Sequence, residues 1–292
     1  MARAPRFDRP VFILGIPRSG TSSLFRVLGT HPDLGSLGHE GHDIWRMFHH
    51  PRLHAWRSDA VEAGEVGVVE RRFVPARFRA HFPHRRFVEK TPENSLRVGY
   101  LLDLFPDARF IVIHRDPADT LNSLINGWRD PAGRYRSYHV PERLTIPDYP
   151  HRYRWCFALI DGWRGHRSSP IPDIAMEQWR QLGSSLVQWR RRVDPSQWTE
   201  IQLEHLRQHP EATLRAVLER LGLPDHPSLH QQLSELRLHP ANALSPPRLA
   251  KWRQENSAAV RERLPAMAPL ASELGYAFDS RRESFEPAAP IT

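Results

Sequence analysis

The apolar residues of this chain form short unbroken runs that alternate with helical patterns. The first run, residues 11–14, is followed by a loop bounded by glycine and proline, and then by a helical pattern. The same succession occurs three times, with strands predicted at 11–14, 87–90 and 108–114, and helices at 22–30, at 96–105 and from Asp116 onward. Strands separated by helices favour a parallel sheet with right-handed crossovers. We therefore expect a three-layer α/β sandwich with a central parallel sheet.

The remaining segments predict further helices and one more strand. The patterns indicate helices at 152–167, 174–192, 210–221 and 258–274, and a strand at 198–203. Residues 35–59 read as irregular, and residues 129–150, rich in Pro, Tyr and Arg, as a long surface loop or lid. No linker divides the chain, so we expect one domain over residues 10–280, with flexible tails at 1–9 and 281–292.

The loop after the first strand carries the clearest chemical signal. Gly15 and Gly20 have the spacing of the phosphate-binding loop G-x-x-x-x-G-K-[ST], but Thr21 replaces its lysine. Backbone N–H groups at such a helix start bind anions. The candidate anion ligands are Arg18, Ser19, Gly20, Thr21, Ser22 and Ser23. The alternative is an ordinary strand-to-helix turn with capping serines. Lys90 ends the second predicted strand and Arg115 follows the third, at the end where parallel sheets carry their sites.

Composition narrows the function classes. The net charge of +8 and a pI near 10.3 suit an anionic partner, but the charge is spread along the chain, so a phosphate-rich small ligand explains it as well as nucleic acid does. Only two of the 41 basic residues are lysines, Lys90 and Lys251. Cys156 is the only cysteine, which excludes an intrachain disulfide and a cysteine metal cluster. No signal-peptide core and no membrane span are evident, so we expect a cytoplasmic protein.

Several motifs together resemble the sulfotransferases that use 3′-phosphoadenosine-5′-phosphosulfate (PAPS). They are the loop Pro17-Arg18-Ser19-Gly20-Thr21-Ser22, the segment from Arg115 to Ser123, and Glu89-Lys90-Thr91-Pro92. Weaker similarity continues through Leu203 to Tyr276, with leucine at position 203 where the family often has tyrosine. The resemblance implies a fold like that of the P-loop nucleoside triphosphate hydrolases. It also implies PAPS as co-substrate, 3′,5′-adenosine bisphosphate (PAP) as product and no metal.

The resemblance also suggests a role for each site residue. Arg18 would contact the 5′-phosphate side and Lys90 the transferring sulfuryl group. Arg115 and Ser123 would hold the 3′-phosphate, with Ser245 and Lys251 completing that site. The alternatives are an ion pair of Arg115 with Asp116 or Asp119, and ordinary surface roles for Ser123 and Lys90.

Transfer of a sulfuryl group to an alcohol, the reaction that the resemblance implies, needs a base at the acceptor hydroxyl. Glu40 follows the loop at the distance at which tyrosylprotein-type relatives carry their catalytic glutamate, while His39 and His42 are rivals because imidazole needs no pKa shift. The spacing of His39 and His42 does not match the zinc motif H-E-x-x-H.

The sequence says little about which compound accepts the sulfuryl group. Aromatic side chains such as Trp45, Trp128, Tyr135 and Tyr138 would line an acceptor pocket or simply pack in the core. We expect a small-molecule or carbohydrate alcohol as acceptor. The competing functions are a small-molecule P-loop kinase, a nucleotide-binding protein without catalysis and, third, a nucleic-acid-binding protein.

Overall fold

The computed structural model describes residues 8–82, 86–238 and 249–288. A parallel five-stranded sheet forms its centre, in the order β2-β3-β1-β4-β7. These strands are β1 (Val11–Leu14), β2 (Gly35–Ser36), β3 (Phe87–Glu89), β4 (Arg109–His114) and β7 (Trp198–Gln202). The central strand β1 pairs with β3 on one side and with β4 on the other, with Phe12 opposite Glu89 and Phe110.

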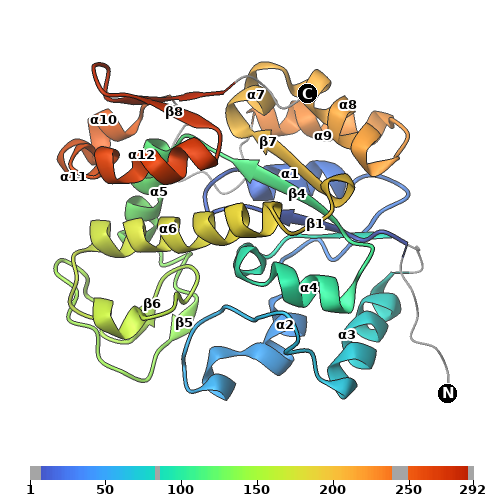
Figure 1. Ribbon diagram of the computed structural model, residues 1–292, viewed down its shortest axis with the longest axis horizontal. Helices are drawn as coiled ribbons and strands as arrows, with labels where there is room; N and C mark the ends of the chain where they lie inside the picture. The colour runs from blue at the N-terminus through green and yellow to red at the C-terminus, as the bar shows by residue number, and fades with distance from the viewer. Residues whose placement is uncertain (1–7, 83–85, 239–248, 289–292) are drawn as a thin grey trace.

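Helices cover both faces of this sheet (Figure 1). They are α1 (Thr21–Leu28), α2 (His42–His49), α3 (Val68–His81), α4 (Val98–Leu104), α5 (Pro117–Trp128), α6 (Ile171–Arg190), α7 (Leu203–Gln208), α8 (Pro210–Leu221), α9 (Pro227–Leu238), α10 (Trp252–Glu255), α11 (Ser257–Arg261) and α12 (Leu264–Glu273). Short 3-10 turns occupy Pro51–His54, Pro92–Leu96, Trp163–His166 and Pro195–Gln197. The prediction of a three-layer α/β fold is confirmed.

The alternation of side chains along each strand creates two separate cores. Val11 and Ile13 point into one core, which contains α1, α8 and α9. Phe12 and Leu14 point into the other, larger core, which includes α4, α5 and α6. Because both faces are covered, β1 is entirely buried, and this explains its unbroken apolar sequence.

Four local predictions were wrong, and a fifth was right only in part. Residues 152–167 form strand β6 (Arg154–Trp155) and a 3-10 turn instead of a helix, because Trp155, Cys156 and Leu159 are buried by tertiary packing rather than along one helical face. The helix predicted at 258–274 is broken into α11 and α12. The loop or lid predicted at 129–150 is irregular over most of its length, but it contains strand β5 (Tyr138–His139), which pairs with β6, and has a buried apolar side in Val140 and Leu144.

The other two errors concern segments expected to lack regular structure. Residues 35–59 contain β2 and α2, and α2 begins at His42, directly after Gly41. The tail predicted at 281–292 contains strand β9 (Ser284–Pro287), which pairs with β8 (Tyr276–Asp279) and buries Phe285. Both segments are short and gain their order from tertiary contacts. Within the described residues, no helix is both long and apolar enough to span a bilayer.

Candidate active site

The loop between β1 and α1 lies at the carboxyl edge of the sheet. Gly20 adopts a left-handed conformation (φ 96°) before the first turn of α1, and Arg18 also has positive φ (80°). A buried serine, Ser95, fixes the start of the loop by accepting from Gly15 N at 3.0 Å and donating to Gly15 O at 3.1 Å. The first turn of α1 carries Thr21, Ser22 and Ser23 and no acidic residue. This arrangement suits an anion.

Three predicted donor-site residues meet beside this loop. The Nε atom of Arg18 donates to the hydroxyl of Ser123 at 3.1 Å, and Nη1 of Arg115 donates to the carbonyl oxygen of Arg18 at 3.0 Å. Arg115 Nη2 also lies 4.0 Å from Asp119, so the alternative ion pair with Asp119 is present. Asp116 instead caps α5 by accepting from Asp119 N at 2.7 Å. The structure thus joins two segments about one hundred residues apart in one cationic site.

A residue outside the predicted donor site also contacts Arg18. The hydroxyl of Tyr135 accepts from Arg18 Nη1 at 2.6 Å, and the guanidinium lies 4.7 Å from the centre of the tyrosine ring. The ring stacks on Phe157 with centroids 5.0 Å apart. Of the aromatic residues considered for an acceptor pocket, Trp45, Trp128 and Tyr138 are instead buried in the core.

Lys90 and Glu40 form the second half of the site. The ammonium of Lys90 donates to Ser22 Oγ at 3.0 Å and forms an ion pair with Oε1 of Glu40. The other oxygen of Glu40 lies 2.7 Å from Nε2 of His42. The predicted base, its histidine rival and the predicted sulfuryl ligand are therefore in direct contact. His39 is exposed, and its ring bonds to the backbone oxygen of Glu40.

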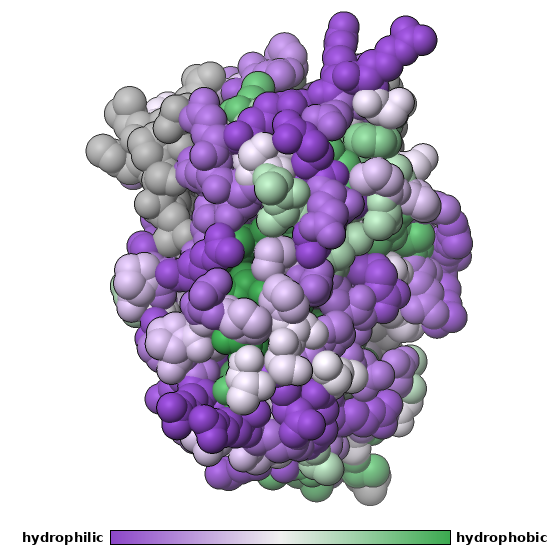
Figure 2. Space-filling model, turned by 90° about the vertical axis from the view of Figure 1, so that its left-hand side faces the viewer, coloured by the Kyte–Doolittle hydropathy of each residue, from purple (hydrophilic) through white to green (hydrophobic). Residues whose placement is uncertain are grey.

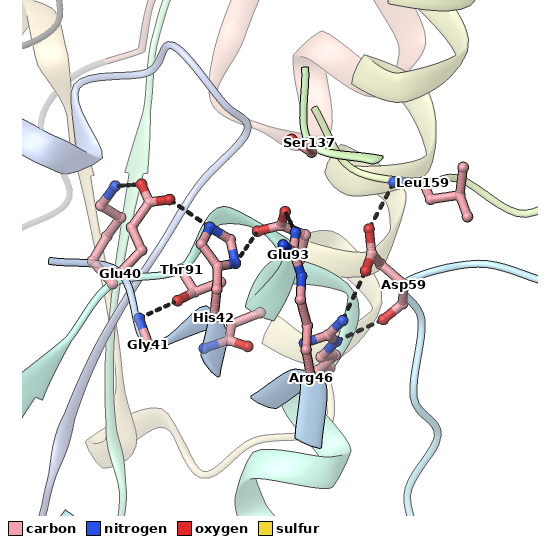
Figure 3. A network of polar contacts seen from close by, with 12 residues as sticks. Glu40, Gly41, His42, Arg46, Asp59, Thr91, Glu93, Ser137 and Leu159 are labelled. Atoms are coloured by element: carbon pink, nitrogen blue, oxygen red, sulfur yellow. Dashed lines mark hydrogen bonds and ion pairs between the residues drawn. The ribbon is translucent and has the colours of Figure 1, made fainter. Parts of the chain in front are cut away.

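The contacts extend inward from Glu40 as a row of alternating charges (Figure 3). Nδ1 of His42 lies 3.8 Å from Glu93, whose side chain is buried, and Arg46 lies 3.5 Å from the other Glu93 oxygen. The guanidinium of Arg46 lies over the ring of Tyr138, 4.6 Å from its centre. His42 is thus held on both sides by carboxylates.

These contacts set the protonation of both catalytic candidates. Burial alone would raise the pKa of Glu40, but the hydrogen bond from His42 and the charge of Lys90 lower it to about 2. Burial alone would lower the pKa of His42, but its bond to Glu40 and the charge of Glu93 raise it. Glu40 is therefore a carboxylate at neutral pH, and His42 favours its charged form.

A buried carboxylate that sequence reasoning missed positions this segment. Glu89 accepts from Gly41 N at 3.1 Å, from Thr91 Oγ1 at 2.5 Å and from Asn94 Nδ2 at 2.8 Å. These bonds join the end of β3 to the residue after Glu40. The available signal was the charge of Glu89 within an apolar strand, since buried charges require partners.

The remaining predicted ligands lie at the start of α5 or beyond the described residues. Asp119 accepts from Ala250 N at 3.1 Å and Trp252 N at 3.3 Å, which places Lys251 next to α5. The Lys251 ammonium lies 3.1 Å from Glu255. Ser245 lies outside the described residues. Among the residues that the structure describes, no group of three or more His, Cys, Asp or Glu could hold a metal ion.

The face toward which the strands point is hollowed along its middle, with apolar residues visible between polar rims (Figure 2).

Residues 10–227 match the sulfotransferase family. The chain belongs to this family. The match contains the loop, Glu40, Lys90, Arg115 and Ser123, whereas Lys251 lies beyond it.

Individual sulfotransferases share this similarity over different lengths. A protein-tyrosine sulfotransferase of Drosophila melanogaster is 24% identical over 91% of this chain, but the match spans only about half (51%) of the fly protein. The omega-hydroxy-beta-dihydromenaquinone-9 sulfotransferase Stf3 of Mycobacterium bovis is 30% identical over 54% of this chain and 35% of its own length.

Solved structures support the fold. Sulfotransferase STF9 from Mycobacterium avium superposes with a TM-score of 0.55 at 18% identity, covering 89% of this chain and 76% of its own. A sulfotransferase from Alicyclobacillus acidocaldarius gives 0.50 at 17% identity, covering 94% and 95%.

Proposed function

We propose that this protein is an enzyme that transfers the sulfuryl group of PAPS to the hydroxyl of a small-molecule or carbohydrate acceptor. The observation that carries the proposal is the convergence of Arg18, Lys90 and Arg115 on one loop, with the carboxylate of Glu40 in contact with Lys90. Sulfuryl transfer to an alcohol requires a base next to a positively charged site that binds the anionic donor. The cytoplasmic localisation is a further proposal, based on the sequence alone.

The residues present fit such a donor. It supplies a sulfur bonded to a good leaving group, the 5′-phosphate. Arg18 and the backbone N–H groups of the loop would neutralise charge on that phosphate, and Arg115 with Ser123 would hold the 3′-phosphate. Lys90 is placed to stabilise the charge on the sulfuryl oxygens.

The base completes the reaction. Glu40 would take the proton of the acceptor hydroxyl as the new sulfur–oxygen bond forms and the bond to the 5′-phosphate breaks. Positioning and electrostatics then account for most of the rate, as in phosphoryl transfer. A kinase would need a lysine at Thr21, the position where the phosphate-binding motif carries one.

Thermal unfolding with added nucleotide tests the donor site. We expect PAP to raise the melting temperature saturably, and ATP, AMP and sulfate to have little effect, because a ligand that binds only the folded state stabilises it. Arg115→Ala should weaken PAP binding about 10- to 100-fold, the range for a lost charge-assisted contact.

Arg109→Ala provides the matched control. Arg109 begins β4, whereas the predicted ligand Arg115 directly follows the end of that strand; Arg109 bonds to Ser196. Loss of the PAP response in Arg109→Ala as well as in Arg115→Ala would show a general effect of charge. No response of wild type to PAP, or an equal response to ATP, would overturn the proposed function. Binding without turnover on any acceptor alcohol would favour the non-catalytic alternative.

A further inference from the structure

Lys90 stands between the anion-binding loop and the base. Its side chain is only 3% exposed, and its ammonium reaches Ser22 on the first turn of α1 and Oε1 of Glu40 on the other side. An ammonium of this kind is a compact charge on a flexible stem, so it can change partners without movement of the backbone. Its two contacts belong to the two substrates' expected sites.

In this arrangement Glu40 is poorly suited to accept a proton. Oε1 is taken by Lys90 and Oε2 by His42, and these contacts lower the pKa of Glu40 to about 2. A useful base has a pKa near the working pH. Loss of one of these two contacts would therefore make Glu40 a better base.

We propose that the Lys90–Glu40 ion pair is the resting state of the site, and that the sulfuryl group of the donor draws Lys90 away and frees Oε1 for the acceptor hydroxyl. This inference rests on the proposed function and concerns the order in which the site becomes competent. His42 keeps its bond to Oε2 and so holds the carboxylate in place.

The charges explain the exchange. A sulfuryl group bound at the loop offers Lys90 anionic oxygens on the side where it already contacts Ser22. Removal of Lys90 from Glu40 removes one of the interactions that lower the pKa of Glu40, so its proton affinity rises. In this proposal Glu40 becomes an effective base only when the donor is bound. Donor binding thus works against the resting ion pair, which weakens donor affinity.

Binding of PAPS and PAP to Glu40→Gln tests this competition. The two nucleotides carry similar charge, but only PAPS has the sulfuryl group. We expect Glu40→Gln to bind PAPS about three- to tenfold more tightly than wild type does, with a change of less than about twofold for PAP. Isothermal titration calorimetry without acceptor measures both constants and is not disturbed by turnover.

Asp43→Asn is the matched control, because Asp43 is an exposed carboxylate on the same helix start as His42. It removes one negative charge without touching Lys90, and it should leave the PAPS-to-PAP affinity ratio at the wild-type value. Glu40→Asp serves if the glutamine variant folds poorly. It keeps the charge, shortens the reach to Lys90 and should give an intermediate ratio.

Because the chain contains only two lysines, NMR can observe the Lys90 side chain directly. Only Lys90 and Lys251 exist in the chain, so selectively labelled lysine gives two side-chain NMR signals, and Lys251→Arg assigns them. PAPS should shift the Lys90 signal more than PAP does, and Glu40→Gln should shift it in the absence of nucleotide.

The outcomes separate the two proposals. An unchanged affinity ratio in Glu40→Gln, together with a Lys90 signal that responds equally to PAP and PAPS, would overturn the resting pair and leave the proposed function standing. Absence of binding by either nucleotide to wild type would remove the proposed function itself. An increased ratio in Glu40→Gln but not in Asp43→Asn supports the exchange.

Discussion

The buried ion pair between Asp59 and Arg97 should respond asymmetrically to removal of either partner. The two side chains are 0% and 1% exposed, and Arg97 Nη2 lies 2.9 Å from Asp59 Oδ1. Asp59 also accepts from Tyr138 and from Leu159 N, at 2.7 Å for the latter. A carboxylate can neutralise itself by binding a proton, whereas a guanidinium cannot. We therefore expect Asp59→Asn to destabilise the fold more than Arg97→Met.

The size of each effect follows from the burial. Asp59→Asn leaves a buried, uncompensated guanidinium and should cost about 3–5 kcal/mol of unfolding free energy. Arg97→Met should cost about 2–3 kcal/mol at neutral pH, because burial raises the pKa of Asp59 and the carboxyl can be neutral. A folded pKa above the ordinary value of about 3.9 gives stability at low pH that is lost as pH rises. The charge of Arg97 lowers the pKa of Asp59, so its removal raises that pKa further in the variant, and the cost of Arg97→Met should shrink from pH 8 to pH 5.

Urea denaturation at pH 5 and pH 8 measures these free energies. The exposed pair Arg180–Glu177 on α6 supplies a control, since Arg180 is 54% exposed and Arg180→Met should cost less than about 1 kcal/mol. The double variant Asp59→Asn/Arg97→Met should recover part of the loss, because neither charge is then left alone. The reasoning is refuted if Asp59→Asn costs no more than the exposed control, or if Arg97→Met is the costlier change at both pH values.

Two further perturbations test the site itself. Gly20→Ala should destabilise the protein by about 1–3 kcal/mol and weaken PAP binding, because Gly20 has φ 96° and an added Cβ would lie 2.7 Å from a Leu203 methyl carbon. In the control Gly38→Ala, where φ is 74° and an added Cβ meets nothing within 4 Å, only the backbone strain is introduced. Equal PAP affinity in wild type and both variants would contradict the role of Gly20 in the binding loop. The pKa of Glu40 in the folded protein is about 2, below its ordinary value of about 4.3, so the stability that Glu40 contributes is present above pH 4.3 and is lost as the pH falls toward 2. The difference in melting temperature between wild type and Glu40→Gln should therefore shrink from pH 5 to pH 3. A constant difference would argue against the ion pair of Glu40 with Lys90.

Sequence reasoning worked where local patterns decide structure. The buried strands β1 and β4 and the loop that follows β1 were predicted because burial on both faces demands unbroken apolar runs. It failed for α2 and β9, which are short and depend on distant partners. Gly41, directly before α2, donates its N–H to Glu89 at the end of β3, a contact between segments 48 residues apart.

The sequence by itself determined the strands β1, β3, β4 and β7, the loop and the identity of most candidate residues, since each follows from a periodicity or a motif only a few residues long. Only the tertiary structure decided which of them touch. Arg115 binds the backbone of Arg18, and Lys90 joins Ser22 to Glu40, across 97, 68 and 50 residues of chain. The physical reason is that parallel strands bring their carboxyl ends to one edge whatever the length of the connections between them. The pKa of Glu40 depends on that convergence, because charge interactions act through space rather than along the chain.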